Sequence, residues 1–514
     1  MAIKKYFATA DTTISNAFDQ SLLGANKATG SNMGAADILE TFQIYGQSSS
    51  SSGLSTELSR ILIQFDTTKI SSDRTAGTIP ASGSCSFYLK MYNAKHNSTL
   101  PTNFKIAVSA VSSSWQEGSG LDMVNYTDKT YGLTGSTWTH ARASGSDGVT
   151  DDGEWTTAGG DYHTEPTFDV GFTNGYEDLE VDVSDVVEQW LAGTKDNYGF
   201  GISLSSSYEQ ETKSYYTKKF FARGTEFYNK RPAIEVRWDN STQDDRGAFF
   251  LSSSLASGED NMNTVYLYNV VRGRLRNIPS IGTDSIYVSI YSGSADNTEP
   301  SGTPLDMVID GTHVSTGLPK VVTGSYVSTG VYKASFAFTG SSTLTKIYDV
   351  WFTGSNSLSS AEGSTQFHTG TIEVNTLNAD IYNPSNRYIL SLSNLRESYG
   401  PTETARFKLY ARPRDWSPTI YTKAKSKPET TTITSASYEI YRASDGLRVI
   451  PFGTGSDYHT GLSYNVSGNY FDLDMSNLEK DQMYGVRFAF YDDAVGSWNT
   501  QPYEFKFKVR DDEY

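Results

Sequence analysis

The segment Ser59-Arg60-Ile61-Leu62-Ile63-Gln64-Phe65-Asp66 carries the pattern that decides the fold class. Bulky apolar residues occupy positions 61, 63 and 65, and Gln64 lies between two of them. This period of two is typical of a β-strand with one face toward a core and the other toward water. The pattern recurs at residues 87–92, 179–183, 234–238, 286–291, 332–338, 388–392, 405–410, 486–490 and 505–509. We therefore expect antiparallel sheets.

Composition supports the same class. The 514 residues are 37% hydrophobic, 13% aromatic and only 20% charged, with 34 Tyr, 25 Phe and 44 Gly. Aromatic residues suit a pleated, half-buried surface, and glycine suits the turns between short strands. This balance excludes a coiled coil, a helical repeat array and a disordered chain. The sequence predicts an all-β protein.

Charge, cysteine content and hydropathy exclude several further classes. The net charge is −17, which repels phosphate backbones, so we expect no nucleic-acid partner. Cys85 is the single cysteine and cannot form an internal disulfide. No apolar run approaches twenty residues, and no apolar segment follows Lys4 and Lys5. We expect synthesis in the cytoplasm without a secretory signal and without membrane insertion.

Turn chemistry divides the chain into three predicted domains. A polar run at residues 239–245 follows a strand that ends at Trp238, and Asn383-Pro384 lies in a second break near residues 378–385. The predicted domains are a jelly-roll β-sandwich at 1–240 and two immunoglobulin-like β-sandwiches at 241–380 and 381–514. One short helix is expected after Ser184 as N-cap, with Gly193 at its end.

A weak internal repeat links the two smaller predicted domains. Residues 330–332 and 468–470 both read G-x-Y, and each is followed by Y-x-V-x-F, at 348–352 and 484–488. In immunoglobulin-like sandwiches, a tyrosine that enters a central strand often bonds back to the preceding corner. Tyr348 and Tyr484 are candidates for such corners. The alternative is a chance similarity between two aromatic hairpins.

Catalytic motifs are missing from the sequence. It has no G-x-S-x-G, H-E-x-x-H, Walker A or dinucleotide-binding fingerprint, and its six histidines are scattered. Cys85 begins an alternating strand, where a small buried thiol is the ordinary interpretation. We therefore expect no enzymatic activity and no organic cofactor.

One acidic cluster is a candidate calcium site. Asp147, Asp151, Asp152 and Glu154 lie in a glycine-rich loop, and calcium takes six to eight oxygen ligands. The spacing is not that of an EF-hand, and a solvated acidic loop is the simpler alternative. Two of these carboxylates could instead act as the acid and base of a glycosidase.

Two groups of aromatic and basic residues are candidate contact surfaces. Tyr215, Tyr216, Phe227 and Tyr228 lie among lysines and arginines, as in sugar-binding platforms and protein interfaces, although some of these rings could line the core. Arg272, Arg274 and Arg276 alternate, which would place them on one face of a strand. That face could meet an acidic neighbouring subunit, or it could be a solvated edge that discourages aggregation.

Residues 1 to about 240 resemble a DNRLRE-type domain, a jelly-roll module of surface-layer and other extracellular structural proteins. The matching blocks lie in the expected order: Ala8-Thr9-Ala10-Asp11-Thr12-Thr13-Ile14, Ser59 to Asp66, Phe87 to Tyr92, Ser114-Trp115-Gln116-Glu117-Gly118, Val181-Asp182-Val183 through Trp190, Asn197-Tyr198-Gly199-Phe200-Gly201-Ile202 and Arg231-Pro232-Ala233-Ile234-Glu235-Val236. An insertion at residues 127–165 departs from that family.

The remainder, especially residues 463–490 and 266–278, resembles C-terminal modules of structural proteins from large tailed phages of marine bacteria. The resemblance implies a non-enzymatic virion component of the neck, tail or capsid surface, located in the virion after synthesis in the host cytoplasm. It implies other virion proteins as partners and a homo-oligomer. The alternatives are an adhesin that binds a host surface glycan and, third, a polysaccharide-degrading enzyme.

Overall fold

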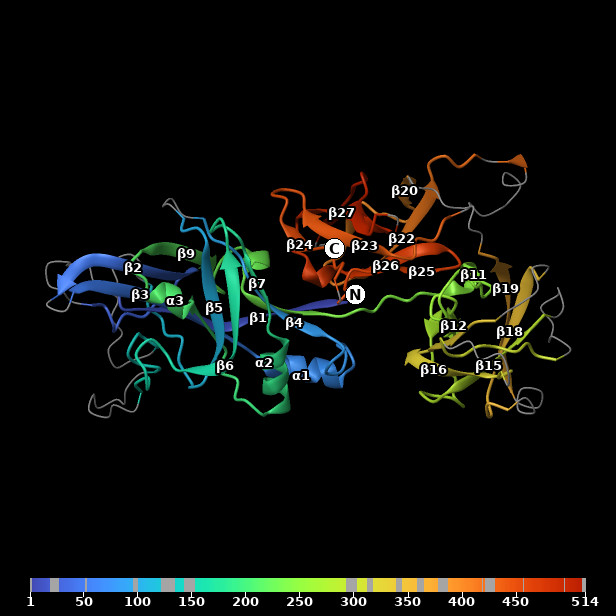
Figure 1. The fold of residues 1–514 in the computed structure, drawn as a ribbon, viewed down its shortest axis with the longest axis horizontal. Helices are drawn as coiled ribbons and strands as arrows, with labels where there is room; N and C mark the ends of the chain where they lie inside the picture. The colour runs from blue at the N-terminus through green and yellow to red at the C-terminus, as the bar shows by residue number, and fades with distance from the viewer. Residues whose placement is uncertain are drawn as a thin grey trace.

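The computed structural model describes residues 2–18, 27–50, 53–95, 100–121, 135–142, 153–292, 303–311, 318–338, 344–357, 365–377, 387–417, 419–420, 430–455, 457–493 and 495–510 (Figure 1). Strands dominate these residues, which confirms the all-β class. The strands fall into three groups along the chain, β1–β10, β11–β19 and β20–β29, here called the first, second and third units. The predicted boundaries at 240 and 380 lie between these groups, and independent folding of three domains stays a prediction.

The first unit is a sandwich of two sheets that share one strand. β1 (Ile3–Ser15) pairs with β10 (Ala233–Arg237) through its first half and with β3 (Gly53–Phe65) through its second half, with an irregular register between Ala8 and Ala10. One sheet has the order β1-β10-β4-β7, and the other continues β1-β3-β8-β5-β6, with β2 attached to β3 and β9 attached to β2. The remaining bounds are β2 (Ile38–Ser50), β4 (Ser86–Met91), β5 (Phe104–Val111), β6 (Tyr162–Phe172), β7 (Leu179–Asp182), β8 (Phe200–Leu204), β9 (Tyr215–Phe221), α1 (Thr67–Thr75), α2 (Ser184–Ala192), α3 (Ser206–Glu209) and the 3₁₀ turn η2 (Tyr228–Lys230).

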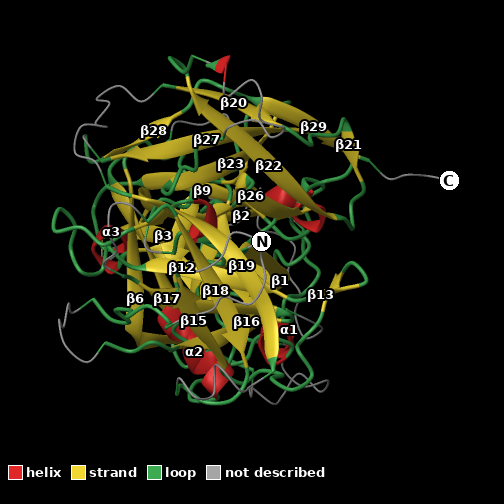
Figure 2. Cartoon of the chain, turned by 90° about the vertical axis from the view of Figure 1, so that its right-hand side faces the viewer, coloured by secondary structure: helices red, strands yellow, loops and turns green. Residues whose placement is uncertain are grey.

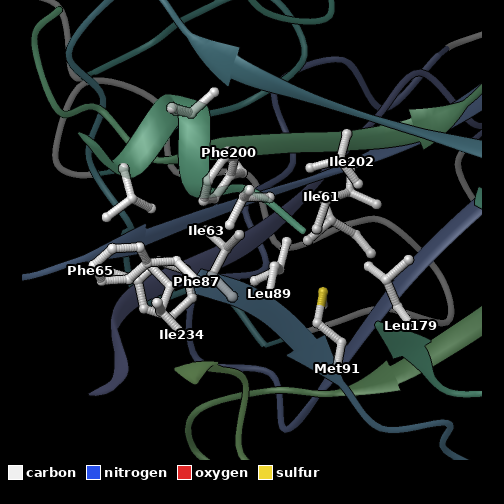
Figure 3. Packing of buried hydrophobic residues seen from close by; sticks show 14 of the residues in the cluster. Ile61, Ile63, Phe65, Phe87, Leu89, Met91, Leu179, Phe200, Ile202 and Ile234 are labelled. Carbon is white, nitrogen blue, oxygen red and sulfur yellow. The ribbon is translucent and has the colours of Figure 1, made fainter. Parts of the chain in front are cut away.

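The apolar positions of the alternating strands face one another between these sheets. Ile61 and Ile63 of β3 pack in the same buried cluster as Phe87 and Leu89 of β4 (Figure 3). All four side chains are fully buried. The period-two pattern of the sequence is thus the inward face of the sandwich.

The predicted short helix is present and closes one end of this core. α2 ends at Gly193, which adopts a left-handed conformation (φ 70°) as a glycine C-cap does. Val186, Val187 and Trp190 of this helix are buried. The N-cap is Val183 rather than Ser184, because the Ser184 Oγ instead accepts a hydrogen bond from the Phe87 amide of β4.

The third unit has immunoglobulin-like topology. A sheet of order β20-β22-β26-β25 packs against one of order β21-β29-β27-β23-β24, and β21 runs parallel to β29. These orders correspond to strands A-B-E-D and A′-G-F-C-C′ of an immunoglobulin sandwich. The bounds are β20 (Tyr388–Leu392), β21 (Ser398–Tyr399), β22 (Thr404–Pro413), β23 (Ala436–Arg442), β24 (Arg448–Ile450), β25 (Ser463–Asn465), β26 (Gly468–Asp474), η5 (Met475–Asn477), β27 (Met483–Asp492), β28 (Ser497–Thr500) and β29 (Phe505–Val509).

The second unit follows a similar plan, but one strand joins its two halves. β16 pairs with β15 through its first residues and with β17 through its last ones, which gives the continuous order β11-β19-β18-β15-β16-β17-β12. β11 runs parallel to β19, like β21 and β29 in the third unit. The bounds are η3 (Asp245–Gly247), β11 (Phe249–Phe250), β12 (Asn263–Tyr268), β13 (Val270–Val271), β14 (Arg274–Leu275), β15 (Ile286–Tyr291), β16 (Val322–Ser328), β17 (Val331–Phe336), β18 (Lys346–Phe352) and β19 (Gln366–Asn375).

Of the two predicted tyrosine corners, the structure has one. The Tyr484 hydroxyl donates to the Glu479 carbonyl (3.0 Å) and accepts from the Glu479 amide (2.7 Å). Tyr348 occupies the other face of its strand, because Ile347 and Trp351 are the residues of β18 that enter the core. The prediction for Tyr348 is therefore wrong. In the second unit it is the Tyr332 hydroxyl that bonds to a preceding loop, at the Gly282 carbonyl (2.8 Å).

The segment between the first and second units is held by the third unit. Gln243 forms a parallel β-bridge with Tyr464 of the edge strand β25. The Tyr464 amide donates to the Thr242 carbonyl (2.9 Å), and the Asp244 amide donates to the Tyr464 carbonyl (3.1 Å). Figure 1 shows the third unit beside this segment, between the other two units. The connection thus extends a sheet of the third unit.

Candidate interaction surfaces

The three alternating arginines lie on a small hairpin that projects from the second unit. We call residues 269–276 the arm; it contains β13 and β14 and lies at the edge of the molecule (Figure 2). Val270 pairs with Leu275 and Val271 with Arg274, which leaves Arg272 and Gly273 as a two-residue turn. Both turn residues have positive φ, 51° and 77°, as such tight hairpin turns require.

This geometry corrects the prediction that the three arginines share one strand face. Arg272 lies in the turn, and only Arg274 belongs to a paired strand, while Arg276 follows it. The chain reverses direction at Arg272 and Gly273, so the regular spacing of the arginines does not correspond to one continuous strand. The arginines therefore surround the tip and one limb of the arm.

The arm exposes both charge and apolar surface. Val270, Val271 and Leu275 retain 56%, 49% and 43% of their surface exposure. Across the described part of the chain, no acidic side chain forms an ion pair with Arg272, Arg274 or Arg276. A hairpin with three bare guanidinium groups thus projects from a chain whose net charge is −17.

The predicted aromatic platform at 215–228 is divided between two places. Tyr215 is buried in the first core, where its hydroxyl donates to Glu211 Oε2 (2.6 Å), so it is unavailable to a ligand. Tyr216 is half exposed and contacts the ring of Phe42. The prediction of one continuous surface is wrong, because neighbouring residues of β9 point to opposite faces.

Phe227 and Tyr228 form a second, separate aromatic group. Phe227 packs edge-on against Phe221, and Tyr228 packs against Phe7, with ring centroids 5.6 and 4.8 Å apart. Lys230 lies over both phenylalanine rings of the first pair. Tyr228 and Phe7 also line a cleft of about 380 Å³, together with Thr404 and Asp474 of the third unit.

The candidate calcium loop falls mainly outside the described residues. Asp147, Asp151 and Asp152 are among the undescribed residues, while Glu154 is exposed and lies 3.9 Å from His140 Nε2. Asp161 accepts hydrogen bonds from the amides of Thr156 and Thr157, so it organises its own loop. Within the described ranges, no group of three His, Cys, Asp or Glu side chains is arranged to hold a metal ion. Calcium binding stays a prediction.

A buried ionic network joins the first and third units. Glu235 of β10 is fully buried and pairs with Arg237 (2.6 Å), Lys5 (3.6 Å) and Lys90 (3.7 Å). The Lys5 ammonium also donates to the Val449 carbonyl of the third unit (3.0 Å). Burial opposes ionisation of Glu235, but the three cations hold its pKa at about 2. The basic side chains on the outer face of the β1-β10-β4-β7 sheet are thus paired with a carboxylate of the same chain.

A trough on the first unit is the feature that sequence reasoning missed. It has a volume of about 440 Å³ and lies on the outer face of the sheet that contains β3, β5, β6 and β8. Arg60, Tyr162, Asp169 and Glu209 are among its walls. The signal available in the sequence was the small size of Ala107, Ser109, Gly201 and Ser203, the residues that alternate with the core positions of β5 and β8.

Comparison with known proteins adds no assignment. No protein-family model and no curated protein matches the chain. Among solved structures, a chimeric titin Z1Z2-Z1Z2 tandem is 12% identical over 40% of this chain and 83% of its own, with a TM-score of 0.15. Trypsin-activated alpha-2-macroglobulin from Escherichia coli is 7% identical over 83% of this chain and 22% of its own (TM-score 0.14), and a tetra-tandem repeat from the extending region of a large adhesion protein is 8% identical over 97% and 98% (TM-score 0.14). Similarities this low carry no argument about function.

Across the described residues, no helix has the length and apolar character needed to cross a lipid bilayer.

Proposed function

We propose that the protein is a non-enzymatic structural subunit of a tailed-phage virion, and that it joins neighbouring subunits through the arm. The observation that carries the assembly role is the contrast between the arm, with Arg272, Arg274 and Arg276, and a chain of net charge −17. The virion as the setting rests on the resemblance of the sequence to phage structural proteins.

The arm has the chemistry of a protein contact. Arginine is enriched in interfaces because its planar guanidinium bonds carboxylates in pairs and packs its stem on apolar groups. Val270 and Leu275 add exposed apolar area. Burial of this area by a partner would stabilise the complex. Since every copy of the chain is acidic, the nearest complementary surface in an assembly is another copy. A homo-oligomer follows from this proposal.

The packing of the three units fits a structural role. The third unit contacts the first through the Glu235 network and binds residues 242–244 through one parallel β-bridge and two backbone hydrogen bonds at Tyr464. An exposed sheet edge is a template for unwanted pairing, and here the chain itself covers the β25 edge. The chain thus covers the β25 edge itself, whereas the arm stays exposed and available for a contact with another subunit.

Sedimentation velocity over a range of concentrations tests this proposal. The wild-type chain should self-associate, and the association should weaken when NaCl rises from about 0.1 to about 1 M, because the Debye length falls from about 10 to about 3 Å. The triple variant R272E/R274E/R276E should associate at least tenfold more weakly. The variant K105E/K333E/K346E is the matched control, since it changes the same net charge at three exposed strand positions.

The control variant should behave like the wild-type chain. A wild-type chain that stays monomeric at 100 µM, or a triple arm variant that associates normally, contradicts the assembly role. Antibodies to the purified chain should also label intact tailed-phage particles in electron micrographs.

A further inference from the structure

The floor of the trough follows from the alternation of two neighbouring strands. In β5, Ile106 and Val108 enter the core, which leaves Ala107 and Ser109 on the outer face. In β8, Ile202 enters the core and leaves Gly201 and Ser203 outside. Since β5 and β8 are paired, these four small residues form one strip across the sheet. The hollow exists because no large side chain rises from that strip.

Tyr162 forms one end of the trough and depends on two glycines. A Cβ atom at Gly201 would lie 1.9 Å from the Tyr162 ring, and one at Gly160 would lie 2.4 Å from its hydroxyl. The ring therefore fills the space over Gly201 that any other residue would take. Its hydroxyl donates to the Gly159 carbonyl (2.8 Å), which fixes the orientation of the ring.

Arg60 is held rigidly beside this ring. Its Nε and Nη2 atoms donate to the two carboxylate oxygens of Glu209, at 3.0 and 2.7 Å, and its Nη1 atom donates to the Gly159 carbonyl at 3.0 Å. A bidentate Arg–carboxylate pair is geometrically strict. The wall is therefore ordered before any ligand arrives, which lowers the entropic cost of binding.

The remaining groups that face the trough are hydroxyls and one further carboxylate. The hydroxyls of Ser109 and Thr167 lie 3.0 Å apart, and Ser203, Ser205 and Ser207 continue the row toward Glu209. Asp169 stands on the opposite wall, on the exposed face of β6. Arg60, Glu209 and Asp169 together carry a net charge of −1, which disfavours an anionic ligand.

We propose that this trough binds a neutral oligosaccharide, with its hydroxyl groups paired to Asp169, Glu209 and the row of serines. A volume of about 440 Å³ falls within the usual range for small-ligand sites. The floor is the face of a paired sheet, so its backbone groups are already bonded to neighbouring strands and an extended peptide could not add as a strand. A hydroxyl-rich ligand instead matches the donors and acceptors of the side chains. This site goes beyond the assembly role of the arm and does not depend on it.

A glycan array of neutral and anionic bacterial and algal oligosaccharides tests the proposal with the full chain. At least one neutral oligosaccharide should bind, and isothermal titration should give its affinity. Asp169→Ala should weaken that affinity at least tenfold, because it removes an acceptor on an exposed wall. Ser203→Trp should abolish binding by filling the floor.

Ser391→Trp is the matched control, since it places the same bulky ring on the exposed face of β20 in the third unit. It should bind as the wild-type chain does, and thermal melting should show that all three variants are folded. The proposal is wrong if no neutral glycan on the array binds, or if binding survives Ser203→Trp. An array that selects only anionic glycans would also overturn it.

Discussion

The Glu235 network and the arm are both charged β-structures, but only one of them is covered. In the network, Lys5, Lys90 and Arg237 surround a buried carboxylate, and the third unit closes over them. In the arm, three arginines stand in water beside exposed apolar side chains. The two regions have similar basic side chains. They differ because the chain supplies an acidic partner for the cations of the network and supplies none, among the described residues, for the arginines of the arm.

This difference indicates how charge is used in the molecule. In the Glu235 network the chain neutralises its own cations. These charges hold the first and third units together, and no other chain can bind them. Where the chain does not neutralise its cations, the same chemistry is available to another chain. Mutations should therefore affect stability at the network and association at the arm.

The largest expected effect is at the network. Glu235→Ala removes a fully buried carboxylate and leaves the buried Lys90 and Arg237 to share the half-exposed carboxylate of Glu180. Removal of one partner of a buried ion pair lowers the free energy of unfolding by about 3–5 kcal/mol. Urea denaturation followed by fluorescence measures this loss. Glu373→Ala, at an exposed position of β19, should leave the denaturation midpoint unchanged, and an equal loss in both variants would contradict the account.

The second largest effect is expected from acid, which should lower the stability that the Glu235 network provides. The pKa of Glu235 is about 2 in the folded chain, below its usual value of 4.5. The stabilisation is therefore fully present above about pH 4.5 and is lost as the pH falls toward 2, up to about 3 kcal/mol. Urea midpoints between pH 2 and 6 for the wild-type chain and for Glu235→Gln give the test. The two curves should converge as the pH falls, whereas a constant offset would show that Glu235 is not the titrating group.

A smaller effect is expected where the third unit holds the connection between the other two. The Tyr464 hydroxyl donates to Asp245 Oδ1 at 2.7 Å. Tyr464→Phe removes this bond and should cost about 1–2 kcal/mol. The Asp244 amide should then exchange its hydrogen faster, as NMR can measure. Tyr491→Phe, whose ring is 38% exposed, serves as the control, and normal exchange at Asp244 in Tyr464→Phe would argue against the pairing.

The positions of the strands could be predicted because the period of two is a local property of the sequence. Which polar faces are covered could not, since Lys90 and Glu235 read as the solvent side of their strands until the third unit is placed on them. The turn of the arm could not be predicted from the arginine spacing either. Gly273 marks a turn, but the regular spacing of the arginines suggested a continuous strand.

The two Y-x-V-x-F segments show the limit of pattern matching. In β27, Tyr484, Val486 and Phe488 enter the core. In β18, the inward set is shifted by one residue and includes the buried Asp349, which pairs with Arg246 of η3. A shift of one residue moves every side chain to the other face. The trough escaped prediction because it is defined by small side chains on two strands that are far apart in sequence.

Hydrogen exchange at the arm amides, measured at low and high protein concentration, tests the central claim most directly. If the arm meets another copy, the amides of residues 270–276 should become protected as concentration rises, and R272E/R274E/R276E should lose that protection. Exchange at these amides that stays the same at every concentration, while protection appears elsewhere on the chain, would contradict the account.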